Sequence, residues 1–148
     1  MRTPVALSFS GGKDSVLALA RLRASGQWDV RALLAAFIEG EGTLVMHEVP
    51  ERLVALQASS LGVPLVTLRV PRAPSNAVYE QRLAAALAPF RSQGVRHIAF
   101  GDLFLEDIKA YRDALMARLG FEPVYPLWGT DTRELARYLH RFCTQGIS

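Results

Sequence analysis

Short apolar blocks and longer amphipathic blocks alternate along the chain, and this alternation predicts five strands, each followed by a helix. The strand blocks are almost continuously apolar, as in strands that are covered on both faces. They span residues 4–7, 30–38, 65–70, 96–100 and 124–125. Because strands and helices take turns, the pattern predicts an α/β fold with one five-stranded parallel sheet and helices on both faces.

The blocks between the strands repeat apolar residues at helical spacing and commonly end at a glycine. The first amphipathic run begins at Val16, directly after a glycine turn. The helix from Glu51 should bury four apolar residues, namely Leu53, Val54, Leu56 and Leu61. The helix from Asn76 contains Pro89, which cannot donate a backbone hydrogen bond, so we expect a kink or break there.

Two more helices are predicted in the second half of the chain. The fourth has Glu106 and Asp107 in its first turn, where carboxylates favour the positive end of the helix dipole. One face of it carries Ile108, Tyr111, Leu115 and Leu119. The fifth is capped within residues 130–132 and carries Leu135, Leu139 and Phe142 on its inner side.

The order of strands predicts where a ligand would bind. In parallel sheets, ligands bind beyond the carboxyl ends of the strands, at the point where the strand order reverses. We expect the order 3-2-1-4-5, which makes the first and fourth strands neighbours. The loop after the first strand and the turn Gly101-Asp102 after the fourth would then flank one crevice.

Residues 8–15 read SFSGGKDS and have the composition of an anion-binding loop between a strand and a helix. Two adjacent glycines permit unusual backbone angles and let a ligand approach the main chain. The unpaired N–H groups of the next helical turn point toward the loop, where the helix dipole favours negative charge. The side chains add the Lys13 cation, the Asp14 carboxylate and the hydroxyls of Ser10 and Ser15. These groups together predict a site for a phosphate chain, with Asp14 as a Mg²⁺ ligand or a helix cap.

Two better-known phosphate loops do not fit these residues. A Walker A loop requires glycine six positions before its lysine and Ser or Thr directly after it, where this chain has Leu7 and Asp14. The dinucleotide pattern requires separated glycines, but Gly11 and Gly12 are adjacent and no third glycine follows. A plain turn does not require two glycines, a lysine and an aspartate together.

Composition agrees with one domain that has a mixed, mildly basic surface. Half of the 148 residues are hydrophobic, which is enough for a single domain with a substantial core. The formal net charge of +3 suits ATP or RNA and is diagnostic of neither. The one cysteine, Cys143, excludes an internal disulfide and an all-cysteine metal site. No apolar run approaches the roughly 20 residues that cross a bilayer, so we expect a soluble, cytoplasmic protein.

The motif SGGKDS resembles, residue for residue, the PP-loop of the ATP pyrophosphatases, which split ATP between its α and β phosphates. Further matches are residues 100–112 (FGDLFLEDIKAYR), the loop around Met46-His47, residues 56–65 (LQASSLGVPL) and Pro126-Leu127-Trp128. Together they resemble the ATP-binding family typified by diphthine–ammonia ligase, over almost the whole chain. The resemblance implies a Rossmann-like, adenine nucleotide α-hydrolase-like fold that binds ATP and Mg²⁺.

The resemblance also implies a reaction and the residues that serve it. The reaction is adenylation of a carboxylate followed by amide formation with ammonia; in eukaryotic and archaeal members the carboxylate belongs to a modified histidine on elongation factor 2. The implied ATP contacts are Ser8, Ser10, Gly11, Gly12, Lys13, Asp14, Ser15, Phe37, Gly101 and Asp102. Among these, Lys13, Asp14 and Asp102 are the implied catalytic residues, and the two aspartates are the implied Mg²⁺ ligands.

On the substrate side, the resemblance points to His47, Glu106, Asp107 and Arg112. A solvated loop histidine explains His47 equally well, and charges at the start of a helix commonly serve as dipole partners. Phe37 ends the second strand as an implied adenine contact, for which a buried core phenylalanine is the alternative.

One motif of the relatives is absent. They continue into a substrate region with the pattern E-x-G-E-[FY], which does not occur here. We therefore expect residues 1–148 to form a single ATP-binding domain without that region, whose exposed sheet edge would allow a homodimer. The leading function is carboxylate adenylation, and a non-catalytic nucleotide-binding module is the alternative. A tRNA-modifying ATP pyrophosphatase is a third, but its sulfur-transferring versions use paired cysteines and this chain has one, so RNA is not the expected partner.

Overall fold

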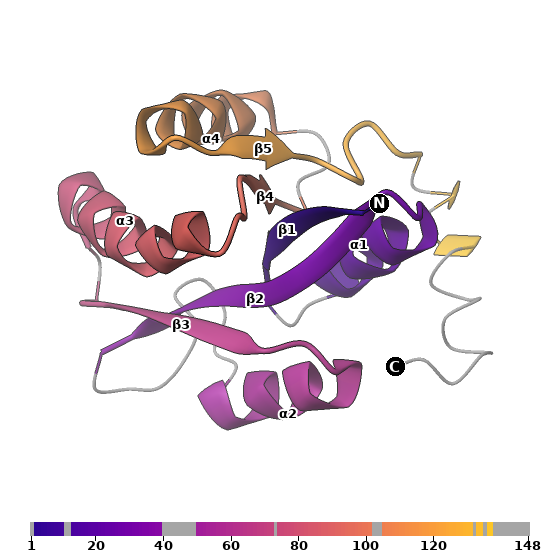
Figure 1. Cartoon of the computed structure of the whole chain (residues 1–148), viewed down its shortest axis with the longest axis horizontal. Helices are drawn as coiled ribbons and strands as arrows, with labels where there is room; N and C mark the ends of the chain where they lie inside the picture. Colours follow the sequence, from indigo (N-terminus) through magenta and orange to yellow (C-terminus); the bar gives the residue numbers. More distant parts are fainter. Residues whose placement is uncertain are drawn as a thin grey trace.

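The computed structural model describes residues 2–10, 13–39, 50–72, 74–101, 105–131, 133–134 and 136–137. Its centre is a sheet of five parallel strands in the order β3-β2-β1-β4-β5 (Figure 1). The strands are β1 (Thr3–Ser8), β2 (Trp28–Ile38), β3 (Leu65–Val70), β4 (His97–Ala99) and β5 (Glu122–Val124). This arrangement confirms the predicted fold class and the predicted strand order.

The helices that connect the strands are α1 (Lys13–Ala24), α2 (Glu51–Leu61), α3 (Asn76–Ser92) and α4 (Glu106–Leu119). Sequence signals set several of their ends. Gly62 and Gly120 follow α2 and α4 in the left-handed conformation, with φ of 72° and 83°, which glycine adopts without strain. The Ser75 hydroxyl accepts a hydrogen bond from the Val78 N–H at 3.2 Å and caps α3.

The core consists of two clusters, one on each face of the sheet. The first joins the sheet to α1 and α2 and includes Val5, Leu7, Leu33, Phe37, Leu17, Leu22 and Val54. The second joins it to α3 and α4 and includes Ala6, Leu34, Ile98, Leu83, Leu87, Leu115 and Met116. Successive strand residues alternate between the two clusters because their side chains point to opposite faces. Helices therefore cover both faces, and Figure 1 shows α2 and α3 on opposite sides of β3.

The prediction that α2 buries Leu53 and Leu56 is wrong, because these residues are 45% and 65% exposed. Val54 and Ala58 are buried instead, and Leu61 packs partly buried against the same cluster. Positions 54, 58 and 61 share one stripe of a helix, whereas 53 and 56 lie about 100° or more around its axis. Only one stripe of α2 faces the sheet, so its other apolar residues remain at the surface.

The predicted break at Pro89 does not occur, since α3 is continuous from Asn76 to Ser92. Pro89 lies in the last turn of the helix at an exposed position. Its missing N–H leaves the carbonyl of Ala85 without a helical partner, and Ala85 is also exposed, where water can satisfy that oxygen. Burial of Leu83, Leu87 and Phe90 on the inner face holds both sides of the proline in one helix.

Other helix boundaries and faces differ from the predictions in smaller ways. Helix α1 begins at Lys13, before the apolar run that starts at Val16. The apolar face of α4 is buried at Leu115, whereas Ile108 and Tyr111 are 39% and 37% exposed. The predicted fifth helix lies largely outside the described residues.

Candidate nucleotide site

The segment after β1 is closed by two serines. The Ser10 N–H donates a hydrogen bond to Ser15 Oγ at 3.0 Å, and the two hydroxyl oxygens lie 2.8 Å apart. Ser15 is 6% exposed, and its contacts with Ser10 are partly buried. The residues between them include Gly11 and Gly12, which lie outside the described residues. The two serines that close the predicted loop are therefore five positions apart.

The first turn of α1 follows the loop directly. Lys13 is the first helical residue, and Asp14 lies in the first turn. The free N–H groups of this turn stand at the carboxyl end of β1, which is the arrangement that binds anions in other proteins. The start at Lys13 places the end of the helix dipole closer to the loop than a start at Val16 would. Lys13's side chain lies outside the described part of the structure.

Gly101 packs directly against this turn. A Cβ atom built on Gly101 would lie 3.3 Å from the Asp14 carbonyl oxygen and 3.7 Å from the Ser15 backbone nitrogen. Strands β1 and β4 are neighbours, with Leu7 paired to Ala99, so their following segments leave the sheet side by side. The structure thus brings together the two turns that the strand order predicted, although Asp102 lies outside the described residues. A side chain at position 101 would therefore press on the backbone of Asp14, which favours glycine there.

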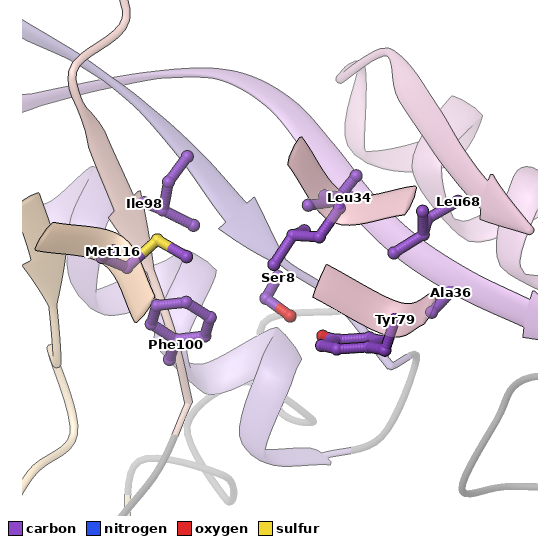
Figure 2. Close-up of a pocket in the computed structure, with 9 residues that line it drawn as sticks. Ser8, Leu34, Ala36, Leu68, Tyr79, Ile98, Phe100 and Met116 are labelled. Atoms are coloured by element: carbon purple, nitrogen blue, oxygen red, sulfur yellow. The ribbon is translucent and has the colours of Figure 1, made fainter. Parts of the chain in front are cut away.

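A small cavity lies beside these turns, on the α3 and α4 face of the sheet (Figure 2). Its volume is about 30 Å³, and it is lined by Ser8, Leu34, Ala36, Leu68, Tyr79, Leu83, Ile98, Phe100 and Met116. This volume holds one or two water molecules, roughly a tenth of the space in a typical ligand pocket. The cavity is therefore too small for an adenine ring, and Ser8 faces it from the end of β1.

Arg112 approaches the same region from α4. Its guanidinium carbon lies 4.6 Å from the centre of the Phe100 ring, directly before Gly101. Burial raises the pKa of the Tyr79 hydroxyl, and the positive charge of Arg112 partly opposes that rise. The structure thus brings one predicted substrate-side residue to the carboxyl edge of β4. Glu106 and Asp107 are exposed at the start of α4.

A group of charged and aromatic residues extends this edge, and two of them, Lys109 and Trp128, belong to the motifs that carry the family resemblance. The Tyr125 hydroxyl donates to Asp113 Oδ1 at 2.7 Å, and Lys109 Nζ lies 3.0 Å from Asp113 Oδ2. Lys109 Nζ also lies 4.8 Å from the Tyr125 ring centre and 5.7 Å from that of Trp128. The hydrogen bond from Tyr125, followed by that from Lys109, lowers the pKa of the Asp113 carboxyl. In the sequence, Lys109 and Asp113 are four positions apart on a predicted helix, a spacing that favours an ion pair.

The remaining predicted site residues lie elsewhere or outside the described residues. Phe37 is fully buried in the cluster beneath α1 and α2, so its position supports core packing, not contact with adenine. His47 lies outside the described residues. The described residues contain no group of three or more His, Cys, Asp or Glu side chains placed to hold a metal ion. None of the described helices is both long and apolar enough to cross a membrane.

Residues 1–123 match a family model described as the diphthamide synthase N-terminal domain. The chain belongs to this family. The match spans most of the sequence, and it confirms the family resemblance based on the SGGKDS loop and the later motifs. The chain is accordingly a domain of the PP-loop ATP pyrophosphatase type. A comparison with curated protein sequences finds no match.

Solved structures share the fold at low sequence identity. One is described as a predicted subunit of a tRNA methyltransferase from Methanocaldococcus jannaschii; it has a TM-score of 0.55 and 20% identity, over 91% of this chain and 73% of that one. Another is the U34-tRNA thiolase NcsA from Methanococcus maripaludis with its 4Fe-4S cluster, with a TM-score of 0.52 and 16% identity, over 93% of this chain. This chain covers 56% of the thiolase. At these identities the comparison establishes the fold alone.

Proposed function

We propose that this domain binds ATP with Mg²⁺ and transfers AMP to a carboxylate with release of pyrophosphate, as the first step of amide formation with ammonia. The observation that carries the proposal is the contact of Gly101 with the backbone of Asp14 and Ser15. This contact joins the wall after β4 to the N-terminus of α1, where phosphate binding is favoured. The family match supports ATP as the nucleotide.

In the proposed reaction, the backbone and side chains of the loop stabilise the leaving pyrophosphate. A carboxylate oxygen attacks the α phosphorus of ATP, the bond from that phosphorus to the bridging oxygen breaks, and its electron pair leaves with pyrophosphate. Negative charge grows on the departing group, so the N–H groups of α1 and the Lys13 cation would stabilise it. Ammonia then attacks the acyl carbon and displaces AMP, which is a far better leaving group than oxide.

The described residues fit a phosphate chain and half of the proposed metal site. Three features lie together at the carboxyl end of β1: the hydroxyl pair of Ser10 and Ser15, the first turn of α1, and Gly101, which has no side chain. The hydroxyls and the N–H groups of the turn would donate hydrogen bonds to the phosphates. Asp14 would hold Mg²⁺ together with Asp102, since carboxylate oxygens are the ligands that Mg²⁺ prefers. Bound Mg²⁺ would offset the negative charge of the phosphates.

The reaction products test the proposal. The protein is incubated with Mg²⁺, with ammonium acetate as a source of carboxylate and ammonia, and with ATP labelled in either the α or the γ phosphate, and the products are separated by chromatography. We expect AMP and pyrophosphate. Appearance of ADP and inorganic phosphate would exclude cleavage between the α and β phosphates. Tight binding of ATP without turnover would favour the alternative, a non-catalytic nucleotide-binding module.

A substitution in the loop tests the phosphate assignment. Lys13→Ala should weaken ATP binding roughly 10- to 100-fold, the usual range for one charge-assisted hydrogen bond. The matched control is Arg23→Ala at the opposite end of α1, which removes the same charge and should leave ATP affinity unchanged. Isothermal titration calorimetry with α,β-methylene-ATP gives both affinities, and an unchanged affinity for Lys13→Ala would contradict the assignment.

RNA modification is a second candidate, favoured by the tRNA-related descriptions of both structural neighbours. Binding of RNA through phosphates should weaken steeply as salt rises, because each contact releases counterions. Filter binding of bulk tRNA between 50 and 200 mM salt, values at which such losses are roughly 10³-fold or more, separates the candidates. Absence of saturable tRNA binding would leave carboxylate adenylation as the proposal.

A further inference from the structure

We propose that Glu39, which directly follows β2, binds the hydroxyl groups of the ATP ribose. This inference rests on the proposed function and adds to it the residue that would recognise the sugar of the nucleotide. A ribose has two neighbouring hydroxyls that can donate hydrogen bonds, and an ionised carboxylate is a side chain that only accepts them. Glu39 supplies such a carboxylate at the end of the strand that pairs with β1, the strand that leads into the phosphate loop.

The end of β2 lies at the same edge of the sheet as the phosphate loop, because β1 and β2 are parallel. Their pairing ends at Ser8 and Leu34, and the Phe9 N–H donates to the Leu34 carbonyl at 2.8 Å. From there β2 continues to Ile38. Glu39 therefore lies five positions beyond Leu34, a rise of roughly 16 Å along the strand. Figure 1 shows β2 extending past the end of β1, so its end borders the space beyond the loop.

An acidic residue after the second strand has a known use in sheets of this strand order. In doubly wound folds, phosphates bind at the turn after the first strand, and an acidic residue roughly 20 positions later binds a ribose hydroxyl. This chain lacks the glycine pattern of the dinucleotide-binding folds but shares the strand order 3-2-1-4. An adenosine attached to phosphates in the loop after β1 would extend toward β2, where Glu39 lies.

The Glu39 carboxylate is held in place by its neighbours. The Glu39 backbone N–H donates to the Val70 carbonyl at 2.7 Å. Arg82 Nη1 donates to Glu39 Oε1, and the same nitrogen donates to the Arg69 carbonyl at 2.8 Å. The carboxylate is therefore fixed from both β3 and α3, so it loses little freedom when a ligand binds. The charge of Arg82 also balances that of Glu39, which limits repulsion of the nucleotide's phosphates.

One oxygen of this carboxylate is available to a ligand. Arg82 contacts Oε1, and no donor among the residues that the structure describes contacts Oε2. Glu51, which pairs with a residue near the carboxyl end of β3, differs in this respect. Arg69 Nη1 and Nη2 donate to both Glu51 oxygens at 2.7 and 2.8 Å. Of these two glutamates, Glu39 is the one whose carboxylate retains an acceptor for the sugar.

Sugar analogues test the inference by binding alone. The full chain is titrated by calorimetry, in the presence of Mg²⁺, with uncleavable α,β-methylene-ATP and with its 2′-deoxy and 3′-deoxy forms. We expect at least one deoxy form to bind about tenfold or more weakly, because it lacks a hydrogen bond to a charged acceptor. Equal affinity for the three nucleotides would overturn the inference. Absence of binding by all three would overturn it together with the proposed nucleotide site.

Substitutions identify the acceptor. Glu39→Ala should bind the three nucleotides within about twofold of one another, because the charged acceptor is gone. Glu39→Gln keeps an acceptor oxygen without its charge and should give an intermediate ratio; it carries the test if thermal unfolding shows that Glu39→Ala is not folded. The matched control is Glu51→Ala, which should keep the wild-type ratio because Arg69 already occupies both Glu51 oxygens. A wild-type ratio in the folded Glu39 variants, or a lost ratio in Glu51→Ala, would overturn the inference.

The failures of this inference and of the proposed function are distinguishable. Formation of AMP and pyrophosphate without any discrimination between the sugars would overturn the inference and retain the adenylation. Discrimination that depends on Glu39, with formation of ADP, would support the inference and reject the adenylation. Lys13→Ala acts on the phosphates and should weaken all three nucleotides by the same factor. A ratio that changes in Lys13→Ala but not in Glu39→Ala would overturn the inference.

Discussion

At the scale of single residues, Gly101 is constrained by the close approach of the α1 backbone. An added Cβ would lie 3.3 Å from the Asp14 carbonyl oxygen, closer than most real Cβ contacts. Gly101→Ala should therefore separate the turn after β4 from α1, destabilise the fold by roughly 1–3 kcal/mol and weaken ATP binding. Urea unfolding and titration calorimetry with α,β-methylene-ATP measure the two effects.

Gly26→Ala is the matched control for Gly101→Ala. Gly26 has a φ of 71° and open space around its Cα, so alanine there causes backbone strain of roughly 1–2 kcal/mol without touching the site. Both substitutions should lower stability, but only Gly101→Ala should also weaken nucleotide binding. Equal nucleotide affinity in the two variants would show that the Gly101 contact does not shape the site.

At the scale of secondary structure elements, α2 shows how packing selects among apolar residues. Val54 is buried, and Leu56, two positions later, is 65% exposed. Val54→Ala should lower the free energy of unfolding by roughly 2 kcal/mol, whereas Leu56→Ala should change it by about 0.5 kcal/mol or less. Urea unfolding followed by circular dichroism measures both, and a larger loss for Leu56→Ala would contradict the observed orientation of α2.

Helix α3 shows that tertiary packing can also override a local backbone signal. A proline predicts a broken helix because it removes one hydrogen bond, yet α3 continues through Pro89. The unpaired carbonyl lies at an exposed position, and buried side chains on both sides of the proline hold the helix to the sheet. The sequence shows that a proline removes one backbone hydrogen bond from the helix. It does not show the tertiary contacts that offset this loss, because they involve residues far apart in the chain.

At the scale of the whole molecule, contacts between α3 and α4 make stability depend on pH. The Tyr111 hydroxyl donates to Glu80 Oε2 at 2.8 Å, and Arg118 pairs with Glu80 Oε1 at 2.7 Å. Burial, and then the hydrogen bond to Glu80, raises the pKa of Tyr111 to about 12. A tyrosine with a raised pKa in the folded state stabilises it below the unfolded pKa of about 10, and this stabilisation is lost as pH rises toward 12.

Tyr111→Phe tests this dependence. Because the contact is largely exposed, the substitution should cost less than about 1 kcal/mol at pH 8. The free energy of unfolding of the wild type should then fall more steeply than that of Tyr111→Phe between pH 10 and pH 12. Urea unfolding across this range measures both curves. Parallel curves would contradict the raised pKa.

The place where the two turns meet was predictable, because local patterns and strand order act together there. The glycine loop and the strand order were enough to predict that the segments after β1 and β4 would meet, and Gly101 does contact the first turn of α1. Arg112 was proposed from the family resemblance, and it lies at this edge. That Ser8 and Tyr79 line one cavity was not predictable, because the two residues are far apart in sequence.

The sequence by itself indicated the α/β class, the strand order and the PP-loop family, since apolar periodicity and the glycine motif can be recognised in local segments. The tertiary structure alone decided which face of α2 is buried, that α3 passes through its proline, and which side chains line the cavity beside the loop. These outcomes depend on which surfaces meet when distant elements pack, and packing is the sum of many contacts that no single segment contains.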